Sequence, residues 1–220
     1  MKTLGVVPAR MGSKGIPGKN KRLFHGKPLF VWAVEVGRAT CDRVVVSSDD
    51  PDILSIAEQY GVEALERPAE LATDETPMVD VLKHVLACQT KSVDAVVLLQ
   101  PTQPLREAKH VKQALWALTL RKGIDSVVSV CEVPPHMSPD YACKIEADLL
   151  SLFLSKKATR RQECRAAYYR DGTVYVIRPH LIRQGQMYGR CAPLLIPLAE
   201  SCTIDTEADW VRAEGMAAHA

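Results

Sequence analysis

Three basic side chains and three glycines follow the first apolar run of the chain. Residues 8–20 come directly after this run and have the sequence Pro-Ala-Arg-Met-Gly-Ser-Lys-Gly-Ile-Pro-Gly-Lys-Asn. Glycines allow a backbone to approach an anion, and Arg and Lys supply the positive charge that binds phosphate oxygens. The pattern therefore predicts a phosphate-binding loop. Its candidate ligands are Arg10, Gly12, Ser13, Lys14 and Lys19.

The spacing of this loop differs from that of two common phosphate-binding motifs. A Walker A motif has four residues between its glycines and a Ser or Thr after its Lys. Here five residues separate Gly12 from Gly18, and Asn20 follows Lys19. A dinucleotide-binding fingerprint needs GxGxxG, whereas these glycines follow GxxGxxG. The spacing argues against P-loop kinases and NAD enzymes, and leaves a generic glycine-rich loop as the alternative.

The distribution of charge also favours a small anionic ligand. Residues 1–34 contain seven Lys or Arg and no Asp or Glu, although the net charge of the 220-residue chain is only +2. Proteins that bind nucleic acid typically carry a broad basic face instead. We therefore expect no nucleic-acid partner, and a solvated basic edge is the alternative that charge alone leaves open.

The composition is that of an ordinary globular protein, with 47% hydrophobic and 25% charged residues. No apolar run approaches the roughly 20 residues that span a bilayer, and the first apolar stretch is too short for a signal peptide. The seven cysteines form no CxxC pair, which argues against a zinc or redox site. We expect a cytoplasmic protein with no membrane partner.

The elements that must position the loop follow from two alternating patterns. Short β-type runs alternate with segments of helical period, which predicts an α/β fold with a mostly parallel sheet between layers of helices. In such a sheet, ligands bind at the carboxyl ends of the strands. The expected strands are 3–8, 43–47, 94–99, 125–131, 173–178 and 194–197. The expected helices are 28–40, 51–60 and 106–122. Another helix is expected to begin at residue 77, and a last one at the capping box of residues 206–209.

The regular pattern weakens after residue 133, where prolines interrupt the chain. Residues 156–170 are basic and contain a single acid. Because no internal repeat or low-complexity linker occurs, we expect residues 1–220 to form one domain. Residues 134–170 are the expected appendage.

Five blocks, in the same order along the chain, resemble the signatures of acylneuraminate cytidylyltransferases. This family includes the CMP-sialic-acid synthetases and their relatives for legionaminic and pseudaminic acids. The blocks are the loop at 8–20, Asp-Arg-Val-Val-Val-Ser-Ser-Asp-Asp at 42–50, Arg-Pro-Ala-Glu-Leu-Ala-Thr-Asp at 67–74, Leu-Leu-Gln-Pro-Thr-Gln-Pro-Leu-Arg at 98–106 and Ile-Asp-Thr-Glu at 204–207. The resemblance covers nearly the whole chain.

The resemblance implies an enzyme that uses Mg²⁺ to couple CTP to an acidic nine-carbon sugar, with release of pyrophosphate. It also implies a three-layer α/β sandwich, built on a Rossmann-like nucleotide-diphospho-sugar transferase sheet, and a homodimer formed by residues 134–170. Two alternatives remain open. One is the related cytidylyltransferase for 3-deoxy-manno-octulosonate, and the other is a catalytically weak homologue that only binds nucleotide.

The same resemblance implies roles for individual residues on the nucleotide side. Arg10 and Lys19 match phosphate-binding positions and would act in catalysis. Asn20 and Arg67 match positions that recognise the nucleotide, and an amide suits the donor and acceptor edge of cytosine. Asp205 matches a magnesium ligand, and we assign it a catalytic role as well.

On the acceptor side, the resemblance places Gln100 against the sugar. Arg161 matches a residue of the sugar-binding region, where a guanidinium can clamp a carboxylate through two hydrogen bonds. Asp171 and Tyr175 lie in the same region. Sialic, legionaminic and pseudaminic acids all remain possible acceptors.

The chain departs from the family pattern at four positions. Gln103 stands where Ser is common, and Tyr169 and Asp171 stand where Arg and Asn are common. Thr203 replaces the first of two Asp residues of the metal site, which leaves Asp205 alone there.

Four of the assigned residues have purely structural alternatives. Gln100 would instead be a loop amide that satisfies backbone groups near two prolines. Arg67 would instead form a surface ion pair with Glu66 or Glu70. Asp205 would instead cap the last helix. Tyr175 would instead only pack in the core.

Overall fold

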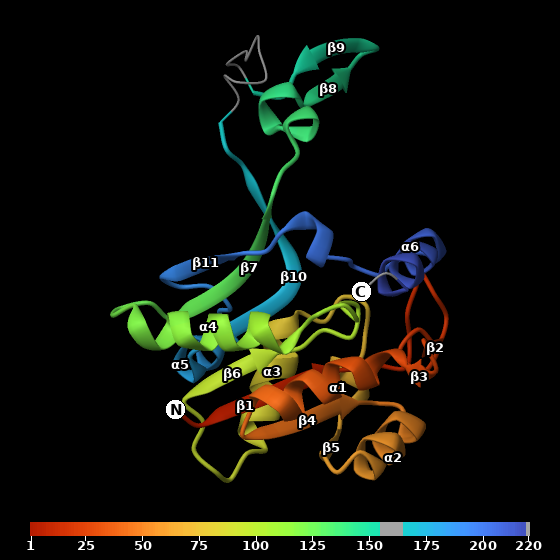
Figure 1. Cartoon of the computed structure of the whole chain (residues 1–220), viewed down its shortest axis with the longest axis vertical. Coiled ribbons are helices and arrows are strands. Elements are labelled where there is room, and N and C mark those ends of the chain that lie inside the picture. Colours follow the sequence, from red (N-terminus) through yellow and green to blue (C-terminus); the bar gives the residue numbers. More distant parts are fainter. Residues whose placement is uncertain (155–164, 219–220) are drawn as a thin grey trace.

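The computed structural model describes residues 1–154 and 165–218. Its centre is a seven-stranded sheet with the strand order β11-β7-β10-β6-β1-β4-β5 (Figure 1). Within this sheet, β10 runs antiparallel to both of its neighbours, and the other pairs of adjacent strands are parallel. The strands are β1 (Thr3–Pro8), β4 (Arg43–Ser48), β5 (Glu63–Glu66), β6 (Ala95–Leu98), β7 (Ser126–Glu132), β10 (Tyr168–Ile177) and β11 (Cys191–Leu195).

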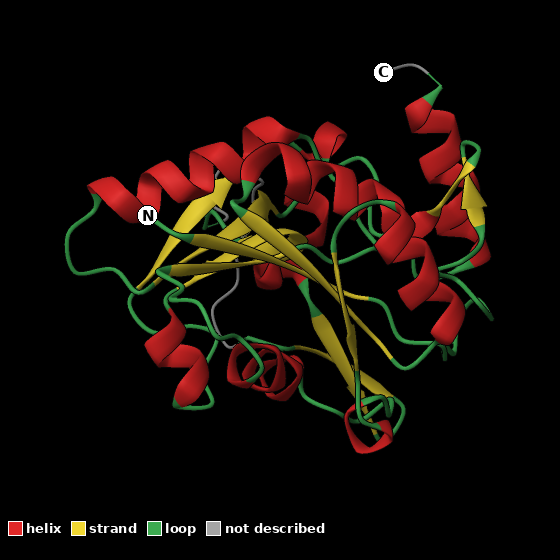
Figure 2. Cartoon of the chain, turned by 90° about the horizontal axis from the view of Figure 1, so that it is seen from below, coloured by secondary structure: helices red, strands yellow, loops and turns green. Residues whose placement is uncertain are grey.

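Helices cover both faces of the sheet and give the molecule three layers (Figure 2). One face packs against α1 (Leu29–Thr40), α2 (Pro51–Gln59) and α4 (Ala108–Leu120). The other face packs against α3 (Met78–Ala87) and α5 (Pro179–Arg183). The last helix, α6 (Glu207–Ala217), lies beside the short hairpin of β2 (Leu23–Phe24) and β3 (Lys27–Pro28). None of the helices in the described part of the chain has the length and apolar character of a membrane span.

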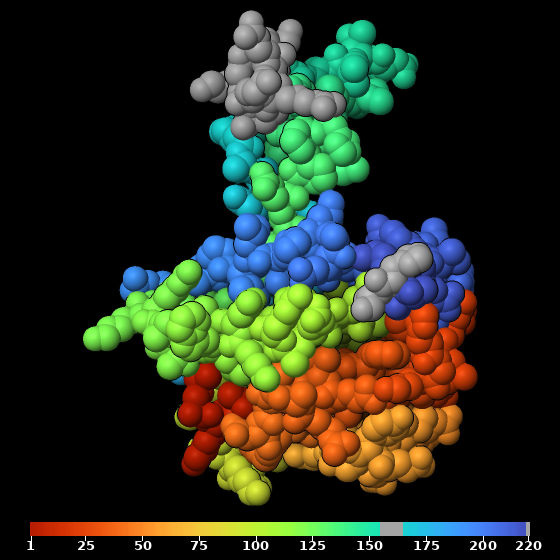
Figure 3. Space-filling model, in the orientation of Figure 1, coloured from red at the N-terminus to blue at the C-terminus, as the bar shows by residue number. Residues whose placement is uncertain are grey.

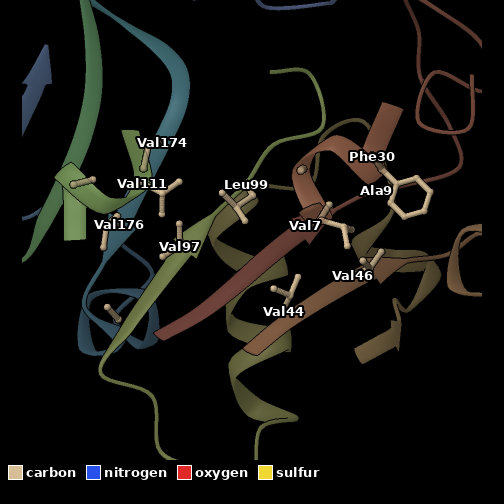
Figure 4. Packing of buried hydrophobic residues seen from close by; sticks show 14 of the residues in the cluster. Val7, Ala9, Phe30, Val44, Val46, Val97, Leu99, Val111, Val174 and Val176 are labelled. Carbon is tan, nitrogen blue, oxygen red and sulfur yellow. The ribbon is translucent and has the colours of Figure 1, made fainter. Parts of the chain in front are cut away.

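The core explains why the central strands are apolar along their whole length. Successive residues of a strand point to opposite faces, so a sheet with helices on both sides needs apolar residues at every position. Val7, Val46 and Val97 point towards α1 and α4, where they meet Phe30 and Val111 (Figure 4). The alternate residues of the same strands pack against α3: Leu4, Val6, Val45, Val96 and Leu98.

The predicted three-layer α/β fold is confirmed, and each predicted strand and helix overlaps one in the structure. The sequence patterns missed β5, which is a four-residue edge strand that begins and ends with exposed Glu residues. They also missed the first half of β10, because Tyr168, Tyr169 and Arg170 are exposed and carry no alternating apolar pattern.

An arm stands away from the three-layer core between β7 and β10 (Figures 1 and 3). Its described part includes a hairpin of β8 (Cys143–Glu146) and β9 (Leu149–Leu152). The backbone N–H of Val133 donates to the carbonyl oxygen of Ala167 at 2.8 Å, so the two ends of the arm are adjacent. Residues 168–170 pair with β7, and the arm is therefore shorter than the predicted appendage at 134–170.

Candidate active site

The five blocks that resemble family signatures meet at one edge of the sheet. The parallel strands β1, β4, β5 and β6 end at this edge, and the first half of β10 reaches it from the opposite direction. The backbone N–H of Ile204 donates to the carbonyl oxygen of Thr102 at 2.9 Å, which brings the fifth block to the fourth. The carboxyl edge of a parallel sheet is where such folds bind nucleotides.

The glycine-rich loop contacts the segment that carries Asp205. Lys19 is only 8% exposed. Its ammonium group donates to the carbonyl oxygen of Ile204 at 2.8 Å and lies 3.0 Å from Asp205 Oδ1. A Cβ atom at Gly15 would overlap the carbonyl oxygen of Asp205, so this close approach requires glycine. The loop and the Asp205 segment therefore form one continuous wall.

The other two cations of the loop share one carboxylate. Arg10 Nη2 pairs with Asp74 Oδ1, and Lys14 Nζ lies 3.2 Å from Asp74 Oδ2. Hydrogen bonds from Arg10 and then from Lys14 lower the pKa of Asp74 below its usual value. Between the two cations, Gly12 is exposed and Ser13 is half-buried. Arg10 and Lys14 thus meet at one carboxylate, and phosphate binding by this loop stays a prediction.

Asn20 holds the loop in shape. It is 8% exposed, and its Nδ2 donates to the carbonyl oxygen of Arg10 at 2.8 Å. The main-chain carbonyl oxygen of Asn20 accepts from the backbone N–H of Phe30 at 3.2 Å, which ties the loop to the start of α1. A further contact of Asn20 with the nucleotide stays a prediction.

Arg67 is a buried cation at the end of β5, with 4% exposure. Its Nε donates to Ser47 Oγ at 3.1 Å, and its Nη2 donates to the carbonyl oxygen of Ser47 at 2.6 Å. Burial lowers the pKa of Arg67 to about 10, against the opposing effect of Asp49, so the guanidinium stays charged at neutral pH. The alternative of a surface ion pair with Glu66 or Glu70 is wrong, because the guanidinium is buried against Ser47.

A buried amide joins three segments beside β10. Gln103 is 3% exposed, and its Nε2 donates to the carbonyl oxygen of Asp171 and, at 2.6 Å, to Thr203 Oγ1. Thr203 Oγ1 in turn donates to the carbonyl oxygen of Asp171 at 3.2 Å. Two positions at which the chain departs from the family pattern, Gln103 and Thr203, therefore contact each other. The contact fixes the backbone two residues before Asp205.

A bulge bends the first half of β10 towards Gln100. The register of β10 against β7 shifts between Arg170 and Tyr175, and Gly172 has a φ of +85°. A Cβ atom at Gly172 would lie 3.1 Å from Gln100 Oε1. Bulges of this kind commonly occur next to active sites, where they redirect side chains. Here the bulge places Gly172, the residue after Asp171, next to Gln100, so the two predicted sugar-site residues Gln100 and Asp171 lie close together.

Arg106 is the second buried guanidinium of this edge, and the sequence patterns did not single it out. It is 4% exposed, its Nε donates to the carbonyl oxygen of Thr173, and its Nη2 donates to that of Gln100 at 2.6 Å. Burial lowers the pKa of Arg106 to about 9, and the charge of Asp171 opposes this effect. Asp171 is also 4% exposed and accepts from the hydroxyl of Thr173. Its carboxylate therefore faces the interior.

Two further residues were predicted for the sugar site. Tyr175 is 9% exposed and belongs to the core cluster on the α3 face, where burial raises the pKa of its hydroxyl. This environment supports a packing role, and a contact with sugar stays a prediction. Arg161 lies outside the described residues.

Asp205 is exposed and pairs with Lys19, and its role as a metal ligand stays a prediction. Its side chain is 66% exposed. The last helix is capped by Thr206, whose hydroxyl accepts from the backbone N–H of Asp209 at 3.2 Å, so the alternative of Asp205 as the cap is wrong. If the enzyme uses Mg²⁺, the exposed carboxylate of Asp205 would hold it together with phosphate oxygens of a bound nucleotide. The hydroxyl of Thr203 already bonds Gln103 and Asp171, so of these two positions Asp205 would be the one to hold a metal.

Another cluster of metal-ligating side chains has a structural explanation. Ligand atoms of Glu107, His110 and Glu200 lie within 4.8 Å of one another. Lys109 Nζ lies 2.8 Å from Glu107 and 2.7 Å from Glu200, which neutralises the two acids. His110 accepts from the backbone N–H of Glu107 as part of a helix cap. The cluster stabilises the start of α4 without a metal.

Solved structures of nucleotidyltransferases share this architecture. The chain matches CMP:2-keto-3-deoxy-manno-octonic acid synthetase complexed with CTP with a TM-score of 0.76, over 100% of this chain and 99% of that one, at 17% identity. It matches 4-diphosphocytidyl-2C-methyl-D-erythritol synthase from Anaerococcus prevotii with a TM-score of 0.66, over 99% and 98% of the two chains, at 11% identity. These likenesses show the fold, which is that of a nucleotidyltransferase.

The sequence comparisons identify the family. Residues 4–194 match the family described as cytidylyltransferase, and the chain belongs to it. It is 32% identical to CMP-N,N'-diacetyllegionaminic acid synthase of Legionella pneumophila, over 97% of this chain and 95% of that protein. It is 29% identical to N-acylneuraminate cytidylyltransferase of Streptococcus agalactiae serotype V, over 98% of this chain and 53% of that protein. The chain thus spans about half the length of the N-acylneuraminate cytidylyltransferases that it matches.

Proposed function

We propose that the protein transfers CMP from CTP to the anomeric hydroxyl of an acidic nonulosonate of the sialic, legionaminic or pseudaminic type. The observation that carries the proposal is the basic loop after β1, in which Arg10 and Lys14 pair with Asp74 and Lys19 pairs with Asp205. The similarity to a legionaminic acid synthase, over nearly the full length of both chains, supports the nonulosonate acceptor. Since CTP is a cytoplasmic nucleotide, we place the reaction in the cytoplasm.

In the proposed reaction, the anomeric oxygen forms a bond to the α-phosphorus of CTP as the bond from that phosphorus to the bridging oxygen breaks. Pyrophosphate leaves, and the hydroxyl proton passes to solvent. Arg10, Lys14 and Lys19 hold the triphosphate and offset the negative charge on the leaving pyrophosphate. Asp205 holds Mg²⁺, which supplies Lewis-acid stabilisation of phosphate oxygens when bound. Gln100, beside the bulge of β10, contacts the acceptor sugar.

We expect pyrophosphate release only when CTP, Mg²⁺ and an acidic nine-carbon sugar are present together. A site that hydrogen-bonds a base discriminates against bases that leave its polar groups unpaired, so turnover with ATP, GTP or UTP should be lower by at least about 100-fold. The measurement is a coupled assay of pyrophosphate with the four nucleotides and a panel of acidic sugars. EDTA is the control for the metal.

Three outcomes of this assay would count against parts of the proposal. Equal turnover of ATP and CTP would contradict the nucleotide assignment. A preference for 2-keto-3-deoxy-manno-octonic acid over every nine-carbon sugar would contradict the acceptor assignment alone. CTP binding without any pyrophosphate release would instead indicate a nucleotide-binding homologue without activity.

We also propose that the arm forms a homodimer. Its β8–β9 hairpin exposes large apolar side chains, with Ile145 at 74%, Leu149 at 73% and Leu150 at 72% exposure. An isolated two-stranded hairpin is marginally stable in water, and exposed apolar patches of this kind mark protein interfaces. A second copy of the arm would bury Ile145 and Leu150, which lie on the same face of the hairpin. This proposal concerns the described part of the arm.

Light scattering at micromolar concentration tests the dimer and should give twice the 24.3 kDa mass of the chain. Ile145 and Leu150 are cross-strand partners on one face of the hairpin, so Ile145→Glu should shift the mass towards the monomer. Ser151 pairs with Lys144 on the other face, and Ser151→Glu is the matched control. A monomeric wild-type protein would refute the proposal, and equal effects of the two variants would remove Ile145 from the interface.

A further inference from the structure

Asp74 contacts the phosphate-binding loop in the manner of a phosphate group. One of its oxygens pairs with the guanidinium of Arg10, and the other lies 3.2 Å from the ammonium of Lys14. Each carboxylate oxygen thus meets a different cation. Two of the three loop cations that would hold a triphosphate are engaged by this single side chain.

The segment around Asp74 is attached to the loop largely through the same cation. Residues 72–77 form neither helix nor strand and connect a short 3-10 helix to α3. Arg10 Nη1 also donates to the carbonyl oxygen of Ala72 at 3.5 Å. The side chain of Asp74 is 33% exposed, and those of Arg10 and Lys14 are 29% and 79% exposed. These ion pairs are therefore open to solvent and to a competing anion.

Asp74 is charged at neutral pH, and Arg10 and Lys14 lower the pKa of its carboxyl group below the ordinary value. A carboxylate and a phosphate oxygen compete for the same N–H donors, since both are anionic acceptors of charge-assisted hydrogen bonds. The donors that Asp74 engages on Arg10 and Lys14 are not free for phosphate oxygens at the same time. A triphosphate that binds through these donors therefore displaces Asp74.

We infer that Asp74 is a positioning residue that occupies the phosphate contacts of Arg10 and Lys14 and is displaced when the triphosphate binds. The inference rests on the proposed function, because it takes the loop to be the triphosphate site. Asp74 keeps the two cations directed towards one point and lowers the affinity of the loop for phosphate. The part of CTP that displaces Asp74 is the triphosphate, whichever sugar accepts the CMP.

The test is calorimetric binding of inorganic tripolyphosphate without metal, at low salt, to the wild type, Asp74→Asn, Asp74→Glu and a control. Asp74→Asn should bind on the order of five-fold more tightly, because it removes two exposed ion pairs with modest coupling energies. Asp74→Glu keeps the charge and should stay close to the wild type. The gain should shrink as NaCl rises, since salt screens exposed ion pairs.

Asp52→Asn is the matched control. Asp52 is 71% exposed and lies 2.7 Å from Lys21, a cation of the same region that the proposal does not assign to phosphate. The Asp52→Asn variant removes an equal charge beside the loop but frees no assigned phosphate contact. Its affinity for tripolyphosphate should therefore stay within about two-fold of the wild type, as expected of an exposed ion pair. An equal gain in both variants would show only a general effect of net charge and would overturn the inference.

The remaining outcomes separate this inference from the proposed function. If the wild type binds tripolyphosphate and Asp74→Asn binds equally or more weakly, Asp74 does not compete with phosphate, and only the inference fails. If the wild type does not bind and Asp74→Asn does, competition is stronger than expected and the inference stands. If neither binds, the loop is not a phosphate site, and the proposed function fails with it.

Discussion

Asp205→Asn is expected to lower turnover by two to three orders of magnitude, roughly the cost of removing one electrostatic contact to a developing charge. The amide binds Mg²⁺ more weakly than the carboxylate does and does not neutralise Lys19, which lies 3.0 Å from Asp205 Oδ1. Higher Mg²⁺ or added Mn²⁺ should restore part of the activity. Folding should be nearly unaffected, because the side chain is 66% exposed and the cap of α6 belongs to Thr206.

The measurements are kcat for pyrophosphate release as a function of Mg²⁺, and thermal unfolding of the same samples. Glu207→Gln is the matched control, because Glu207 is an exposed acid two residues further on that pairs with Arg22. It removes the same charge from the same helix start and should keep turnover within about three-fold of the wild type, as expected of an exposed ion pair. Near-wild-type turnover of a folded Asp205→Asn protein would exclude Asp205 from the mechanism.

Arg106→Met is expected to destabilise the protein by about 3–5 kcal/mol, which is the usual cost of leaving a buried charge uncompensated. The substitution removes the hydrogen bonds to the carbonyl oxygens of Thr173 and Gln100. It also leaves the buried carboxylate of Asp171 without the nearby positive charge that the guanidinium provides. The loss of stability should appear as a lower urea concentration at the midpoint of unfolding. The dependence of the unfolding free energy on urea concentration should stay unchanged.

Two further variants test the reason for this loss. Asp171→Asn in the Arg106→Met background should recover part of the stability, because it removes the uncompensated carboxylate. Arg38→Met, at an exposed position in the last turn of α1, should change the unfolding free energy by no more than about 0.5 kcal/mol. A loss below about 1 kcal/mol for Arg106→Met would show that the buried guanidinium is dispensable.

The sequence predicted the elements whose signals are local. The Val-rich strands needed no information beyond their own residues, because burial on both faces makes them apolar throughout. Asp50 and Pro51 predicted the start of α2, where Asp50 accepts from the backbone N–H of Asp52 at 3.0 Å. The glycine-rich loop was located correctly for the same reason, since its position follows from the strand before it.

The contacts that complete the site were not predictable, because they join residues far apart in the chain. Gln103 and Thr203 each look like an isolated departure from the family pattern, and their hydrogen bond becomes apparent only when β6 and the Asp205 segment are brought together. The pairing of Asp74 with Arg10 likewise spans 64 residues. Local patterns identify which residues are polar, and the fold decides which of them meet.

The arm begins and ends on neighbouring strands, at Val133 and Ala167, which are joined by a backbone hydrogen bond. To the rest of the sheet it is therefore equivalent to the turn of a β-hairpin. The entropic cost of closing such a turn rises slowly, by about 0.6 kcal/mol for each doubling of its length. Evolution can lengthen, shorten or exchange this insertion without rebuilding the strands beneath it. The proposed dimer interface and the proposed active site therefore lie on separate parts of the fold, so that a change in the arm leaves the sheet edge intact.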